Sequence, residues 1–137
     1  MKKENNVIIV DIDGTIALRG ERNPYDWFNV INDKPNTPIV KLLMQLEDWN
    51  DLIFVSGRKD VCMSQTVMWL KNQGFDVSEL YMRDSDDDRP DEIVKKEIYQ
   101  VHIAHRDVLC VFDDRNKVVS MWRELGLTCL QVAEGDF

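Results

Sequence analysis

Five short apolar runs along the chain constrain its fold more than any other feature of the sequence. They cover residues 7–10, 52–55, 80–82, 108–112 and 127–132. An unbroken apolar run of this length is typical of a strand that is buried on both faces of a parallel sheet. We therefore expect a strand at each run, and the first of them ends directly before Asp11.

Helical patterns separate the runs. Thr37 is expected to cap the first helix, with Pro38 in its first position and an end near Trp49. A second helix is expected over residues 61–73, because Gly74 readily takes the left-handed conformation of a helix end. The apolar residues of the first helix recur at spacings of three, as Val40, Leu43 and Leu46.

Two more helices are expected in the second half of the chain, one starting near Asp91 and one ending at Gly126. Strands that alternate with helices predict right-handed crossovers and a parallel sheet that is covered on both faces. The predicted fold is therefore a three-layer α/β sandwich around a parallel, Rossmann-like sheet. The apolar faces of these two helices are Val94, Ile98 and Val101, and Val118, Trp122 and Leu125.

The composition fits one soluble domain. The chain has 137 residues, 44% hydrophobic and 31% charged, which suits a single domain over residues 1–137. No apolar run is long enough to cross a membrane, and residues 1–6 are polar and unlike a signal peptide. We expect a cytoplasmic protein without membrane contact. The cysteines form no Cys-x-x-Cys pair, and Cys110 and Cys129 are expected to be buried thiols.

The formal net charge of −8 limits the kinds of partner. Tight binding along a nucleic-acid duplex requires many lysines and arginines that displace counterions from phosphates. The charge argues against such binding, but it is compatible with recognition of a single strand end. Many acidic residues lie in residues 84–92, most of which we expect to form a solvated loop.

Two carboxylates follow the first apolar run, Asp11 and Asp13, and Gly14 then lets the chain turn. Burying this much charge without a use would be costly. A calcium loop does not fit, because its glycine belongs at the sixth position and here it is at the fourth. The remaining alternative is a structural turn capped by aspartates.

A second acidic pair, Asp113 and Asp114, follows the fourth apolar run. Taken alone, it could be a helix cap. In parallel sheets, however, ligands bind at the carboxyl ends of the strands, so both acidic pairs are expected to face one crevice. Carboxylates this close repel one another, and a divalent cation with a lysine or arginine would compensate. Mg²⁺ prefers such oxygen ligands.

Candidate cations and phosphate ligands occupy suitable positions. Arg58 follows the second strand, and Lys95 lies one turn after Asp91. Lys95 could equally be an exposed helix lysine. Ser56 lies in a strand-to-helix turn, where its hydroxyl could hold a phosphoryl oxygen or simply serve the turn.

In this order, the residues resemble the four motifs of the haloacid dehalogenase superfamily of phosphotransferases. The motifs are Asp11-x-Asp13-Gly14-Thr15, Ser56, Lys95 and Asp113-Asp114. More narrowly, almost the whole chain is similar to the phosphatase domain of phage-type polynucleotide kinase/phosphatase. The segments that carry this likeness are residues 11–17, 24–26, 55–58, 91–98, 102–104, 113–115, 118–123 and 131–137.

The resemblance implies a haloacid dehalogenase-like fold with a small or absent cap. It also implies removal of a 3′-phosphate, and opening of a 2′,3′-cyclic phosphate, at nucleic-acid 3′-ends of DNA or RNA. Arg22, Arg58, Arg83 and Asp91 match positions of the family that contact substrate. Members of this family usually carry a kinase domain, but the chain has no Gly-x-x-x-x-Gly-Lys-Ser/Thr loop, so we expect no kinase domain here. A homo-oligomer and a separate kinase or ligase partner stay open.

Together these residues predict a phosphatase mechanism through a phospho-aspartate. Asp11 would attack phosphorus, and Asp13 would protonate the leaving oxygen and then activate water. Ser56 and Lys95 would neutralise the phosphoryl oxygens. The expected Mg²⁺ ligands are Asp11, the backbone carbonyl of Asp13, and Asp114, with Asp113 as a neighbouring ligand or acting through water.

Other functions also fit the sequence. A nucleotidase or another small-molecule phosphatase would share the chemistry, and a non-catalytic accessory protein could keep the fold. The insert at residues 14–36 is too short for a large lid, which suits a polymer end better than an enclosed small substrate. Its aromatic residues could stack on a terminal base, although we expect Trp27 and Phe28 to pack against the sheet.

Overall fold

The computed structural model describes residues 6–137 and shows one five-stranded parallel sheet. From the sequence we predict that residues 1–6 are not a signal peptide. Of these residues, only Asn6 is among the described ones. The predicted α/β sandwich is confirmed. Across the sheet the strands are β5 (Glu79–Arg83), β4 (Asp51–Lys59), β1 (Asn6–Val10), β6 (Asp107–Asp113) and β7 (Cys129–Gln131).

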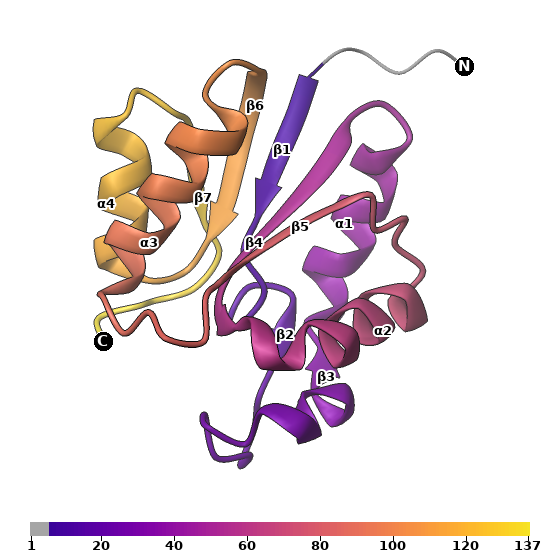
Figure 1. The fold of residues 1–137 in the computed structure, drawn as a ribbon. Coiled ribbons are helices and arrows are strands. Elements are labelled where there is room, and N and C mark those ends of the chain that lie inside the picture. The colour runs from indigo at the N-terminus through magenta and orange to yellow at the C-terminus, as the bar shows by residue number, and fades with distance from the viewer. Residues whose placement is uncertain (1–5) are drawn as a thin grey trace.

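Two helices cover each face of the sheet (Figure 1). On one face lie α1 (Thr37–Glu47) and α2 (Met63–Gln73), and on the other lie α3 (Asp91–Ile98) and α4 (Asn116–Glu124). The side chains of β1 alternate between the two faces, as in any strand. Ile8 and Val10 pack on the side of α1 and α2, and Val7 and Ile9 pack on the other side.

The order of the strands in the sheet determines where the candidate site lies. β1 is the central strand, with β4 on one side and β6 on the other. The chain leaves β1 towards β4 and returns later to β6, so the carboxyl ends of β1 and β6 flank a topological switch point. Ligands of open α/β sheets bind at such a point. Asp11 follows β1 there, and Asp113 ends β6.

Two details of the helices differ from the sequence-based expectation. Asn36, not Thr37, caps α1, because the Asn36 carbonyl accepts the first helical bond from Val40 N at 2.9 Å. Val101 is 66% exposed instead of buried. After α3 the chain forms a π-helical turn, η3 (Tyr99–Ile103), which shifts the helical period so that Ile103 becomes the buried residue. The expected ends at Gly74 and Gly126 are confirmed, since both have positive φ angles.

The segment between β1 and α1 forms only a small cover. It contains the antiparallel pair β2 (Ala17–Leu18) and β3 (Lys34–Pro35) and the 3₁₀ helix η1 (Trp27–Asn32), and a second 3₁₀ turn, η2 (Asp60–Cys62), precedes α2. Trp27, in η1, packs against a small core as expected. Phe28 is 67% exposed because it lies on the outer side of η1.

All three cysteines are buried free thiols. Among residues 6–137, no helix combines the length and the apolar character that crossing a membrane requires.

Candidate active site

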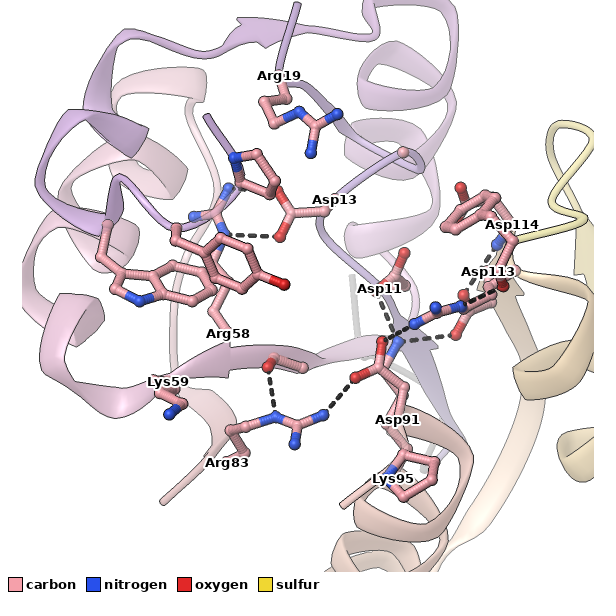
Figure 2. A pocket seen from close by; sticks show the side chains of 18 of the residues that line it. Asp11, Asp13, Arg19, Arg58, Lys59, Arg83, Asp91, Lys95, Asp113 and Asp114 are labelled. Atoms are coloured by element: carbon pink, nitrogen blue, oxygen red, sulfur yellow. Dashed lines mark hydrogen bonds and ion pairs between the residues drawn. The ribbon is translucent and has the colours of Figure 1, made fainter. Parts of the chain in front are cut away.

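A cavity of about 810 Å³ opens at the carboxyl ends of β1, β4 and β6 (Figure 2). Its walls contain eight of the 17 lysines and arginines of the chain but only six of its 25 acidic residues. The cavity is therefore far richer in cationic groups than the acidic chain as a whole. This distribution suits a negatively charged ligand.

Asp11 and Lys95 form the floor of the cavity. Lys95 Nζ donates to Asp11 Oδ1 at 2.7 Å and to Asp113 Oδ2 at 3.1 Å, and Lys95 is 2% exposed. Burial alone would lower the pKa of Lys95, but the carboxylates of Asp11 and Asp113 outweigh it and raise that pKa. The lysine is therefore a buried ammonium ion and not the exposed helix residue that the sequence left open.

The carboxylates around Lys95 are fixed by further donors. Thr15 Oγ1 donates to Asp11 Oδ2 at 2.7 Å. The indole of Trp122 donates to Asp113 Oδ2 at 3.1 Å, and the backbone N–H of Asp114 donates to Asp113 Oδ1 at 2.8 Å. Asp113 thus has three fixed donors, whereas the Asp114 carboxylate points towards Gly14. Gly14 has a φ angle of +81°, and any Cβ there would overlap the Asp114 carboxylate.

Asp11, Asp113 and Asp114 form a buried oxygen cluster that can hold a divalent cation. Their ligand atoms lie within 4.8 Å of one another. Burial and the neighbouring Asp113 raise the pKa of Asp11 well above its usual range and outweigh the attraction of Lys95. Burial also raises the pKa of Asp114. One lysine does not neutralise three carboxylates, so the donor set fits a hard cation such as Mg²⁺.

Asp13 is held by Arg58 from the neighbouring strand. Arg58 Nε and Nη2 bind the two oxygens of Asp13 at 2.9 and 2.8 Å. The Arg58 guanidinium also donates to Thr66 Oγ1 at 3.0 Å, and Arg58 is 1% exposed. Burial would lower the pKa of Arg58, but Asp13 and Asp33 raise it overall. Arg58 therefore orients Asp13, which is itself 43% exposed towards the cavity.

Asp33 is a functional candidate that sequence reasoning missed. Its side chain is 1% exposed and accepts Arg22 Nε and Nη2 at 2.8 and 3.0 Å and Arg58 Nη2 at 3.1 Å. Arg22 Nη2 also lies 3.8 Å from Asp13 Oδ1. Asp33 thus joins two arginines of the cavity wall. No motif or spacing marks it, because it follows an irregular 3₁₀ turn.

Ser56 differs from the other predicted site residues in that it does not line the cavity. It is 1% exposed in β4, and its Oγ accepts the backbone N–H of Arg58 at 3.1 Å. The described residues that line the cavity include its neighbours Gly57 and Arg58 but not Ser56. In this structure Ser56 therefore shapes the turn that carries Arg58.

Arg83 and Asp91 belong to the cavity wall, but their polar groups are engaged within the protein. Arg83 donates to the carbonyl oxygens of Gly57, Asp87 and Arg89 and to Asp91 Oδ1. Asp91 Oδ2 accepts Arg115 Nη1 at 3.0 Å, which the sequence did not predict. Arg83 thus fastens the acidic loop 84–90 to β4.

We expect Arg83→Met to destabilise the fold more than it changes substrate affinity. The variant removes four donated hydrogen bonds, three of them to backbone carbonyls, and should lower the free energy of unfolding by about 1–3 kcal/mol. Urea unfolding measures this loss. Lys71→Met, at an exposed lysine of α2, is the matched control and should change stability by less than about 0.5 kcal/mol. An unchanged unfolding midpoint with a raised KM would instead make Arg83 a substrate ligand.

Comparison with known proteins now decides the family. The family model described as the polynucleotide kinase PNKP phosphatase domain matches residues 5–137. The chain belongs to this phosphatase family. The resemblance seen in the sequence is therefore confirmed, and the buried Asp11–Lys95 pair lies in a phosphatase domain of the haloacid dehalogenase type.

Relatives of this PNKP phosphatase family include a putative bifunctional polynucleotide kinase/RNA ligase of Autographa californica nuclear polyhedrosis virus. It is 35% identical over 124 residues, which are 86% of this chain and 18% of the viral protein. Chains in two structures of the Pnkp1/Rnl/Hen1 complex, one described as an RNA repair complex, are 36% and 38% identical, with TM-scores of 0.93 and 0.92. They match 100% and 97% of this chain, which spans 46% and 47% of theirs.

More distant structures share the fold alone. A class C acid phosphatase of Bacillus anthracis is 18% identical with a TM-score of 0.59, over 85% of this chain and 54% of that one. A haloacid dehalogenase-like hydrolase of Streptococcus pneumoniae is 14% identical with a TM-score of 0.62, over 92% and 83% of the two chains. The PNKP-type phosphatase domain is thus a haloacid dehalogenase-like fold, as the sequence predicted.

Proposed function

We propose that this domain removes the 3′-phosphate from nucleic-acid ends through a phospho-aspartate on Asp11. The observation that carries the proposal is the buried Asp11, bound by Lys95 at 2.7 Å in a cavity rich in cationic groups. Membership of the polynucleotide kinase phosphatase family supports the 3′-end as substrate. A 2′,3′-cyclic phosphate would be a second substrate at the same end, although as a phosphodiester it must have two phosphorus–oxygen bonds to the sugar broken before phosphate is released.

In the first step, a carboxylate oxygen of Asp11 attacks phosphorus, and the bond between phosphorus and the sugar O3′ breaks. Asp13 gives its proton to O3′, which leaves as a hydroxyl group. Lys95 donates to the phosphoryl oxygens as negative charge develops on them. Asp13 suits this role because it is exposed to the cavity while Arg58 fixes its orientation.

In the second step, water attacks phosphorus of the phospho-aspartate and gives a proton to Asp13. The bond between phosphorus and Asp11 breaks, inorganic phosphate leaves, and both aspartates return to their starting states. The carboxylate oxygens of Asp13 retain lone pairs beyond those used by Arg58, so Asp13 can accept this proton and still accept hydrogen bonds from Arg58.

Asp11 and Asp114 would hold Mg²⁺, with the backbone carbonyl of Asp13 and with Asp113 beside them. Bound there, the cation offsets the repulsion between the Asp11 carboxylate and an anionic phosphate. Asp113 already accepts three hydrogen bonds, from Lys95, Trp122 and a backbone N–H, so it holds Lys95 in place. Asp114 is the more available ligand.

The relatives support a role in RNA or DNA end repair. By analogy with the repair-complex chains and the viral kinase/ligase, we propose that kinase and ligase activities act on the same ends, on this protein or on partners. The domain would then prepare a 3′-hydroxyl group for joining.

Phosphate release from matched oligonucleotides tests the proposal. Protein with Mg²⁺ should release phosphate from 3′-phosphorylated DNA or RNA at least about tenfold faster, as kcat/KM, than from 5′-phosphorylated oligonucleotides or free nucleoside monophosphates. Chelation with EDTA should abolish release, and Mg²⁺ should restore it. Equal or faster release from the free monophosphates would favour a nucleotidase, and no release from any phosphate ester would favour an accessory protein.

A further inference from the structure

The outer wall of the cavity carries an exposed cation and an exposed aromatic ring, Arg19 and Tyr25. Tyr25 is 79% exposed. Its ring meets Trp27 edge to face, with the ring centroids 6.3 Å apart and the planes at 85°. Trp27 is partly buried in a small core, so it supports Tyr25 from one side. The ring of Tyr25 is therefore available to a planar ligand.

The loop that presents Tyr25 is fastened to the active site. Arg22, which binds Asp33, also donates from Nη1 to the carbonyl oxygens of Asn23 and Asp26, at 3.1 and 3.3 Å. The Asn23 side chain accepts the backbone N–H of Tyr25 at 2.9 Å. The position of Tyr25 is thus set by an arginine of the cavity wall, which reduces the ordering cost when a ligand binds.

Arg19 differs from every other cation of the cavity. Within residues 6–137, its guanidinium has no hydrogen-bond or ion-pair partner, while each of the other seven cations that line the cavity has a carboxylate partner. Figure 2 shows Arg19 on the far side of Asp13 from Asp11 and Lys95. Arg19 is therefore free to bind an anion that lies farther out than the reacting phosphate.

We propose that Arg19 and Tyr25 form a subsite for the nucleotides next to the reacting 3′-phosphate. Tyr25 stacks on the terminal base, and Arg19 binds the phosphodiester that precedes the terminal nucleoside. Stacking tolerates any base, and an arginine contact to a phosphate reads no sequence. This inference rests on the function proposed above and adds to it a substrate class, namely strands with at least one internal phosphodiester.

The first test compares a 3′-phosphorylated oligonucleotide with a nucleoside 3′-monophosphate, which lacks that phosphodiester. In the wild-type protein the KM of the oligonucleotide should be the lower one. Arg19→Ala should reduce the ratio of the monophosphate KM to the oligonucleotide KM roughly fivefold, since one phosphate contact is lost. The kcat for the oligonucleotide should stay within about twofold of the wild-type value. Lys41→Ala, at an exposed lysine of α1, is the matched control and should leave the ratio unchanged.

The second test combines Tyr25→Ala with an oligonucleotide whose 3′-terminal nucleotide is abasic. Tyr25→Ala should raise the KM of the normal oligonucleotide by about tenfold, which corresponds to the loss of one stacked base. It should have little further effect on the abasic substrate, because no base is left to stack on the ring. Phe28→Ala removes an aromatic ring of the same segment that is 67% exposed and does not line the cavity, so it should change neither KM value.

Each outcome discriminates between the two proposals. If the wild-type protein releases phosphate from 3′-ends but Arg19→Ala keeps the KM ratio, the subsite is wrong and the proposed function stands. An equal effect of Tyr25→Ala on normal and abasic substrates also overturns the subsite. If the wild-type protein releases no phosphate from any 3′-end, the proposed function itself fails.

Discussion

Asp11→Asn should abolish phosphate release while the protein stays folded. An amide is a poor nucleophile and cannot form the phospho-aspartate, so we expect a fall in kcat of ~10⁴-fold or more. Steady-state phosphate release with saturating Mg²⁺ measures the loss. A variant that retains more than about a tenth of the wild-type kcat would contradict the proposed nucleophile.

The same variant should make the metal-free protein more stable near neutral pH. Burial and Asp113 raise the pKa of Asp11 in the folded state, so the folded chain holds this proton more tightly than the unfolded chain. The metal-free fold therefore loses stability as the pH rises above the ordinary range of an aspartate, until Asp11 is ionised. Lys95, whose folded pKa is raised, keeps its contribution until strongly alkaline pH.

Asp11→Asn removes this pH-dependent loss. In EDTA at pH 7, thermal or urea unfolding should show a gain of about 1–2 kcal/mol over the wild-type protein. Adding Mg²⁺ should stabilise the wild-type protein more than the variant, because the variant lacks one charged ligand. Asp51→Asn, at a carboxylate on the opposite end of the sheet, provides the control. A variant less stable than the wild-type protein in EDTA would mean that the Lys95 ion pair outweighs the burial of Asp11.

Arg58→Lys should reduce both activity and stability. Arg58 binds Asp13 through two nitrogens and also reaches Asp33 and Thr66, and one ammonium group cannot make these contacts together. Because the buried Asp33 and the partly exposed Asp13 then lose hydrogen bonds from the guanidinium, we expect a loss of about 1–3 kcal/mol in the free energy of unfolding. Because Asp13 loses its fixed orientation, kcat should fall by about 10²-fold.

The structure offers a matched control for Arg58. Arg106 pairs with Glu79, and more loosely with Asp51 at 3.9 Å, at the opposite end of the sheet, and it is 25% exposed. Arg106→Lys should leave kcat unchanged and cost less than about 1 kcal/mol. If Arg58→Lys instead raised KM alone and left unfolding unaffected, Arg58 would contact substrate, as the family resemblance implied.

The strand ends could be predicted from the sequence because apolar runs and the residues that follow them are local signals. That rule selected Asp11, Asp13, Asp113 and Asp114, and the structure brings these residues to adjacent strand ends. The prediction that Lys95 is a site residue depends on the family resemblance, since its position beside Lys96 is also typical of an exposed helix lysine. Only the fold shows that it is buried against Asp11.

The remaining features depend on contacts that leave no periodic pattern. Asp33 is 25 residues from Arg58 in sequence and lies after an irregular turn, so no spacing rule reaches it. The π-helical turn at Tyr99–Ile103 reverses the expected burial of Val101, because one extra residue per turn rotates the apolar face. The family resemblance predicts that Arg83 and Asp91 contact substrate. Their bonds within the protein depend on how the acidic loop folds against β4, which no sequence pattern indicates.

The central position of β1 has a consequence for folding. Its strand partner β6 is about a hundred residues away along the chain, as the pairing of Asn6 with Asp107 shows, and Lys95 is 84 residues from Asp11. Contacts this distant in sequence form late and slowly, because long loops must close first. A nascent or partly unfolded chain in which these elements have not docked therefore lacks the Lys95–Asp11 pair of the catalytic centre. Activity should return during refolding only with the last cooperative step, when β6 docks beside β1.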